Sequence, residues 1–151
     1  MEPNSNRSRS FGTAVAPGRV RAKPMILVAE DSADTRDMLQ MLLGLKGYDV
    51  LAAASGLQAV EVALTKFPDL ILLDLELPLL DGLAVTRNLR RHPKFKDVPI
   101  VVVSGHDPRK YRELALEAGC TDYLFKPIDF DRFNEILKRS APLSRGSDDE
   151  V

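Results

Sequence analysis

Three acidic residues stand directly after apolar runs, where a charge is costly unless something pairs with it. The run 70–73 contains only leucine and isoleucine and ends at Asp74, and the run 25–29 ends at Glu30 and Asp31. A carboxylate at the end of a buried segment needs a cation or hydrogen-bond donors beside it. The rest of the chain must therefore supply a partner for these acids.

Two other polar side chains close later runs of the same kind. The β-branched stretch "VPIVVVSG" (98–105) brings Ser104 to its end, and "TDYLFK" (121–126) ends in Lys126. In an open parallel sheet, ligands bind at the carboxyl ends of the strands. If the runs are parallel strands, we expect the three acids, the hydroxyl and the amine to converge at one edge.

Such a set points to phosphoryl chemistry. Crowded carboxylates repel one another, and Mg²⁺ relieves this because it prefers carboxylate and phosphate oxygens. A metal and Lys126 beside an accessible aspartate would neutralise the oxygens of a phosphoryl group, and aspartate can accept that group covalently. Ser104 can then donate a hydrogen bond to a phosphoryl oxygen.

Each of these residues also has an ordinary interpretation. Glu30 and Asp31 can begin a helix, Ser104 can belong to a turn, and Lys126 can be a surface lysine. Asp74 is too far from the next helix start to act as its cap. The ordinary interpretations compete one by one, but together they leave the convergence unexplained.

The elements that must position these residues alternate along the chain. Short apolar runs bounded by turn residues predict strands, and apolar residues at helical spacing predict helices between them. The predicted strands are 25–29, 48–54, 69–74, 98–105 and 121–126. The predicted helices begin near Ser32, Ser55, Gly82, Arg109 and Phe130 and end near Gly47, Phe67, His92, Ala118 and Ser140. This order predicts an α/β fold, a doubly wound parallel sheet with helices on both faces.

Composition places the alternation in one domain. The 151 residues are 44% hydrophobic, and the net charge of −1 implies neither a nucleic-acid surface nor a polyanionic tail. We expect residues 1–24 to form a disordered basic arm, 25–140 the domain, and 141–151 a disordered acidic tail. The single cysteine, Cys120, excludes an intrachain disulfide and fits a small residue at a helix-to-strand junction. Without a long apolar run or a secretory signal, we expect a cytoplasmic protein.

Four motifs resemble the response-regulator receiver domain of two-component signalling. They are "ILVAEDS" (26–32), "LILLDLELPLLDG" (70–82), "IVVVSG" (100–105) and "YLFKP" (123–127), and the resemblance covers about residues 24–140. It implies a flavodoxin-like (βα)5 fold with strand order 2-1-3-4-5. It also implies a chemotaxis-regulator-like, stand-alone receiver, because no output domain fits after residue 140.

The resemblance assigns roles by position. It implies that Asp74 is the phosphoacceptor and that Ser104 and Tyr123 are the switch residues, while Lys126 stabilises the phosphoryl group. The implied Mg²⁺ ligands are Glu30, Asp31, Asp74 and the backbone carbonyl of Glu76. The motif residues Pro78, Asp81 and Gly82 match the turn that follows the acceptor.

This sequence departs from the family pattern in conservative ways. Glu30 stands where aspartate is more usual, and leucines replace methionines in "LPLLDG". Glu76 and His106, each two residues after a site residue, occupy the positions that tune hydrolysis of the acyl phosphate. Two interpretations remain open for them: an acid–imidazole pair beside the acceptor, or two separate solvent-facing loop residues.

The resemblance implies a signalling protein rather than an enzyme. Asp74 would take a phosphoryl group from a histidine kinase or a histidine phosphotransfer protein. Ser104 would move toward it, Tyr123 would turn inward, and the surface of the last two helices and the last strand would change for a downstream protein or for a homodimer. We expect neither membrane nor nucleic acid as a partner. The alternatives are a phosphorylation-independent binding module and a phosphotransferase of the haloacid-dehalogenase type.

Overall fold

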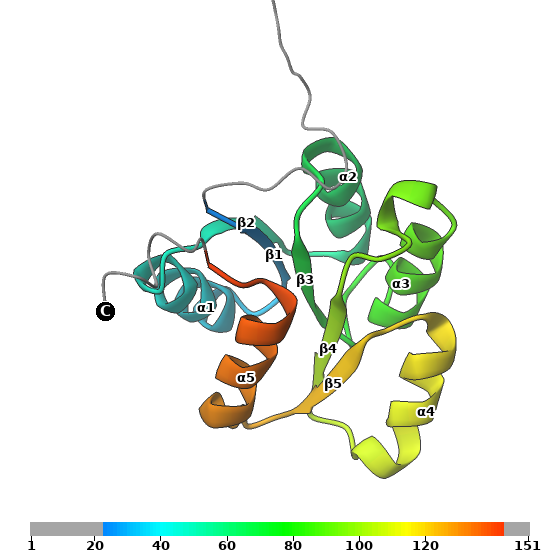
Figure 1. Cartoon of the computed structure of the whole chain (residues 1–151). Coiled ribbons are helices and arrows are strands. Elements are labelled where there is room, and N and C mark those ends of the chain that lie inside the picture. The colour runs from blue at the N-terminus through cyan, green and yellow to red at the C-terminus, as the bar shows by residue number, and fades with distance from the viewer. Residues whose placement is uncertain (1–22, 144–151) are drawn as a thin grey trace, which may run out of the picture.

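The computed structural model describes residues 23–143 as a five-stranded parallel sheet between two helical layers (Figure 1). The predictions for residues 1–22 and 144–151 lie outside this range. The strands are β1 (Met25–Ala29), β2 (Asp49–Ala53), β3 (Leu70–Asp74), β4 (Ile100–Ser104) and β5 (Asp122–Phe125). The helices are α1 (Ala33–Leu45), α2 (Gly56–Lys66), α3 (Gly82–Arg90), α4 (Pro108–Ala118) and α5 (Phe130–Ser140), with a 3₁₀ turn, η2 (Pro93–Phe95). The strand order β2-β1-β3-β4-β5 confirms the predicted fold.

The central strands are apolar on both sides, as a sheet covered on both faces requires. In β3, Leu70 and Leu72 pack with α1 and α5, whereas Ile71 and Leu73 pack with α2, α3 and α4. All five residues of β3 are buried, including Asp74. Figure 1 shows the two layers, with α1 and α5 on one side of the sheet and the other three helices opposite.

The strand register brings the polar strand ends to one edge. Ala29 pairs with Leu73, so Glu30 and Asp74 leave neighbouring strands side by side. Asp74 pairs with Val103, one residue before Ser104. The strand β5 ends at Phe125 rather than at Lys126, but the Lys126 amide still donates to the Ser104 carbonyl over 2.7 Å. The lysine therefore arrives at the same edge.

Short polar side chains begin every α-helix, as N-cap chemistry demands. In each case the side-chain oxygen accepts a hydrogen bond from a backbone amide in the first turn; the five caps are Ser32, Ser55, Asp81, Asp107 and Asp129. Gly119 closes α4 with a φ of 112°, a left-handed conformation that favours glycine. Each helix is thus anchored at the sheet edge that carries the acids.

Apolar residues cover more of α1 than the face that the fold buries. Leu39 and Leu43 are buried, but Met38 is 41% exposed and Leu45 is 81% exposed. Among the described residues, no helix combines the length and apolarity that crossing a membrane would require.

Candidate functional site

Lys126 lies between two buried carboxylates at the carboxyl edge of the sheet. Its Nζ is 3.3 Å from Glu30 Oε1 and 3.3 Å from Asp74 Oδ2. The Glu30 and Asp74 side chains are 5% and 9% exposed, whereas the Lys126 side chain is 33% exposed. The Lys126 ammonium group therefore reaches the site from the solvent side and pairs with two buried carboxylates.

Asp31 completes an acidic cluster with the same two residues. One carboxylate oxygen from each of Glu30, Asp31 and Asp74 lies within 4.8 Å of the others, and Asp31 is the exposed member. Three hard oxygen ligands at this spacing, one of them open to water, suit a cation such as Mg²⁺. The residues that the sequence predicted as metal ligands through their side chains are thus brought together.

The electrostatics of the cluster reflect burial and crowding. Burial raises the pKa of the Glu30 carboxyl and the nearby negative Asp74 adds to the rise, although the Ser32 amide and Lys126 oppose it. Burial by itself would lower the pKa of the Lys126 ammonium, but Asp74 and Glu30 reverse this and raise it overall. The lysine thus stays charged while Glu30 resists ionisation.

Backbone contacts fix the loop that follows Asp74. The Glu76 amide donates to Asp74 Oδ1 over 3.0 Å, and the Gly82 amide donates to the Leu75 carbonyl over 2.9 Å. A Cβ on Gly82 would lie 2.5 Å from the Asp74 carbonyl oxygen. Only glycine lets α3 begin so close to the end of β3. The Glu76 amide therefore orients the Asp74 side chain, while Gly82 fixes the backbone on which that side chain sits.

Ser104 and Tyr123 lie on the neighbouring strands and are connected through one residue. The His106 amide donates to Ser104 Oγ over 2.9 Å, and the Tyr123 hydroxyl donates to the His106 carbonyl over 2.9 Å. Tyr123 is 3% exposed, and burial raises the pKa of its phenol. The ring is therefore already buried in this structure, whereas the sequence predicts that it turns inward on phosphorylation.

The side chains of Glu76 and His106 meet across the site. His106 Nε2 contacts Glu76 Oε2, which resolves the two open interpretations in favour of a pair. The Glu76 side chain is 69% exposed and the His106 side chain is 36% exposed, so the pair lies at the solvent-facing side of the site. The Tyr111 ring packs against the imidazole with a centroid distance of 4.7 Å.

Sequence reasoning missed three residues that support the site. Arg36 donates to the Glu30 carbonyl over 2.9 Å, and Tyr111 supports His106 as described above. Gly56 begins α2 against the loop after Asp74: its amide donates to the Pro78 carbonyl, and a Cβ there would lie 1.7 Å from the Leu80 oxygen. Only Arg36 had a signal in the sequence, since its spacing from Glu30 places it one turn into the following helix.

The comparisons with known proteins agree with this geometry. Residues 26–138 match the family model of the response regulator receiver domain. The polar-differentiation response regulator DivK of Brucella ovis is 32% identical over 113 residues, which cover 75% of this chain and 92% of DivK. The DNA-binding dual master transcriptional regulator RpaA of Synechocystis sp. is 34% identical over 125 residues, 83% of this chain and 51% of RpaA.

A solved receiver domain has a similar fold. The receiver domain of the sensor histidine kinase PA1611 from Pseudomonas aeruginosa, with magnesium coordinated in its active-site cleft, is 36% identical with a TM-score of 0.72. The match covers 78% of this chain and 97% of that domain. The chain spans about half the length of RpaA but nearly all of the other two. On the family model and the DivK relationship, this chain belongs to the response regulator receiver domain family.

Proposed function

We propose that the chain is a phosphorylated switch in which Asp74 accepts a phosphoryl group from a phosphohistidine of a histidine kinase or phosphotransfer protein. The observation that carries the proposal is the convergence of Glu30, Asp31 and Asp74 beside Lys126. An Asp74 oxygen forms the new bond to phosphorus while the bond between phosphorus and the donor imidazole breaks. The family has signalling roles with such partners, and we place this chain with them rather than with enzymes.

The acidic cluster would hold Mg²⁺ through Glu30, Asp31, Asp74 and the Glu76 carbonyl. The ion would neutralise charge on the phosphoryl oxygens when bound. On the opposite side, Lys126 already lies within 3.3 Å of Asp74 Oδ2 and can move its contact to a phosphoryl oxygen. A bound Mg²⁺ on one side and Lys126 on the other would together balance the three carboxylates, which Lys126 alone does not.

Ser104 would report phosphorylation to the rest of the domain. Its Oγ accepts the His106 amide, and its own hydroxyl proton can be donated to a phosphoryl oxygen. Because His106 also binds Tyr123, a shift of Ser104 reaches the surface of α4, β5 and α5. We propose that a downstream protein, or a second copy in a phosphorylation-dependent homodimer, reads this surface.

The pair of Glu76 and His106 would set how long the phosphorylated state lasts. The two side chains are in contact and partly exposed, and we propose that they shield the site from an attacking water. The chain would work as a stand-alone receiver, which the 92% coverage of DivK supports. We also propose a cytoplasmic location, which the free, buried Cys120 thiol suits.

The direct test is mass spectrometry of the whole chain with acetyl phosphate, with and without Mg²⁺. We expect one added phosphoryl group that needs Mg²⁺ and is lost in Asp74→Asn. Pull-downs with wild type and Asp74→Asn then show which partner depends on the modification. Labelling that survives in Asp74→Asn would refute the assignment of the acceptor. No labelling at all, with partner binding intact, would favour a phosphorylation-independent binding module.

A further inference from the structure

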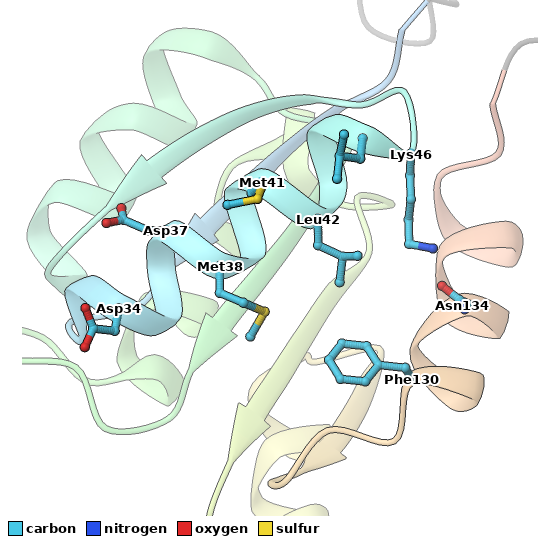
Figure 2. Close-up of a pocket in the computed structure, with 9 residues that line it drawn as sticks. Asp34, Asp37, Met38, Met41, Leu42, Lys46, Phe130 and Asn134 are labelled. Carbon is cyan, nitrogen blue, oxygen red and sulfur yellow. The ribbon is translucent and has the colours of Figure 1, made fainter.

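An apolar groove lies between α1 and α5, on the face opposite α2, α3 and α4. It has a volume of about 610 Å³, and Figure 2 shows Met38 and Leu42 of α1 facing Phe130 of α5 across it. Met38, Met41 and Phe130 are 41%, 66% and 44% exposed. These two methionines and one phenylalanine form an exposed apolar patch. Burying such a patch against another apolar surface is favourable.

The charges at the two ends of the groove differ. Asp34 and Asp37 line one end, and Lys46 lines the other (Figure 2). Both aspartates are exposed on α1. The acidic end thus favours an occupant that carries positive charge next to an apolar side chain.

The chain itself contains such a sequence before the described residues. Residues 1–22 carry four arginines against one glutamate, and the stretch 7–21 reads "RSRSFGTAVAPGRVR". It places Phe11 two residues after Arg9, with Val15 and Val20 following. An apolar side chain flanked by guanidinium groups is the chemistry that the acidic end of the groove accepts.

The point where this segment joins the fold is close to the groove. Lys23 Nζ lies 3.7 Å from Asp49, and the Pro24 carbonyl accepts the Asp49 amide, three residues beyond Lys46. The helix from Asp34 to Lys46 spans about 18 Å. A dozen residues can cover about 40 Å when extended, so Phe11 reaches Met38 with length to spare.

We propose that residues 7–21 dock intramolecularly in the groove between α1 and α5, with Phe11 against Met38 and the arginines near Asp34 and Asp37. A tethered segment faces its site at a millimolar effective concentration, so even weak contacts fill it. The other terminal segment also leaves the fold near Gly47, where Leu143 packs. Its residues 148–150 are all acidic, and the two aspartates would repel them.

Paramagnetic relaxation in the full-length chain tests the proposal. A nitroxide is attached at Ser10→Cys in a Cys120→Ala background, and amide intensities are compared with the reduced label. We expect residues Met38, Met41 and Leu45 to lose about half their intensity or more, as a tethered occupant would cause. Leu57, an equally apolar and exposed residue on α2, should keep its intensity.

Two matched samples decide the occupant and its chemistry. Substituting Asp34→Lys and Asp37→Lys together should abolish the loss at Met41, whereas Glu61→Lys on α2 should leave it unchanged. If the loss appears only when labelled and isotope-enriched copies are mixed, the occupant is a second copy and the proposal is wrong. Unchanged intensities along α1 in the Ser10-labelled chain would equally overturn it and leave the groove to another protein.

Discussion

Glu30 and Asp74 are two buried carboxylates that share a single ammonium group. Lys126 is equally distant from both, so one charge must offset two, and the surplus negative charge favours either a proton or a metal ion. The raised pKa of Glu30 follows from this arrangement. The crowded carboxylates therefore repel one another unless a proton or a cation binds beside them.

The first prediction concerns the pH dependence of this repulsion. Because the folded-state pKa of Glu30 lies above its usual value of 4.5, the folded protein retains a proton that the unfolded chain has lost. Stability must then fall as pH rises from 4.5 through the raised pKa. Without Mg²⁺, Glu30→Gln should match wild type at low pH and exceed it at pH 7 by about 1 kcal/mol or less, since the partly exposed Lys126 offsets part of the cost of the Glu30 charge.

Urea unfolding across that pH range measures the difference. Asp122→Asn is the matched control, because Asp122 is also buried but is paired with Arg132 at 2.6 Å and Arg139 at 2.9 Å. Removing that charge should destabilise the protein at pH 7. A Glu30→Gln variant less stable than wild type at pH 7 would show that Lys126 dominates the site instead.

The second prediction concerns the contact between His106 and Glu76. If the pair restricts water at the mouth of the site, His106→Ala should speed loss of the phosphoryl group from Asp74 by several-fold, about 1 kcal/mol or less of barrier. The rate of phosphate release after removal of the donor measures this. Tyr111→Leu, which removes only the ring beside the imidazole, should have a smaller effect. An unchanged or slower release in His106→Ala would count against the shielding role.

At the scale of elements, the start of α2 supports the loop that follows Asp74. Gly56 touches the Leu80 carbonyl so closely that no side chain fits. The third prediction is that Gly56→Ala displaces this loop, lowering the free energy of unfolding by about 1–3 kcal/mol and slowing phosphorylation of Asp74. Gly44→Ala is the control: it lies in α1 with open space around it, and should stabilise by about 0.5–1 kcal/mol.

Chemical denaturation and the rate of labelling by acetyl phosphate give the two readouts. If Gly56→Ala and wild type had equal free energies of unfolding, the loop would accommodate the added methyl group without loss of stability, contrary to the prediction. A normal labelling rate in a destabilised variant would separate the packing role of Gly56 from any role in the site.

The elements also show what a sequence can reveal. The strand ends could be predicted because each polar residue directly follows a short, mostly apolar run, which is a local signal. Gly56 could not be predicted, because its importance arises only when α2 meets a loop more than twenty residues away. Likewise, helical spacing groups Met38 with Leu39, but only the packing of α1 in the folded core decides which of them is buried.

At the scale of the whole molecule, the acidic cluster joins distant parts of the chain. Glu30 and Asp31 follow β1, and Asp74 ends β3, so the cluster exists only in the folded sheet. A ligand that binds only the folded state stabilises it by mass action. Mg²⁺ should therefore raise the free energy of unfolding, and a chelator should reverse the effect.

The fourth prediction gives this coupling a size and a control. At one hundred times its Kd, Mg²⁺ should stabilise the wild-type chain by about 2.7 kcal/mol, measured by urea unfolding at constant ionic strength. Asp31→Asn should lose most of this gain, because Asp31 is the exposed member of the cluster and its charge is the easiest for a hydrated ion to reach. Asp37→Asn removes an exposed acid in the second turn of α1, outside the cluster, and should keep the gain. An equal gain in both variants would mean that Mg²⁺ acts through general screening rather than through the sheet edge.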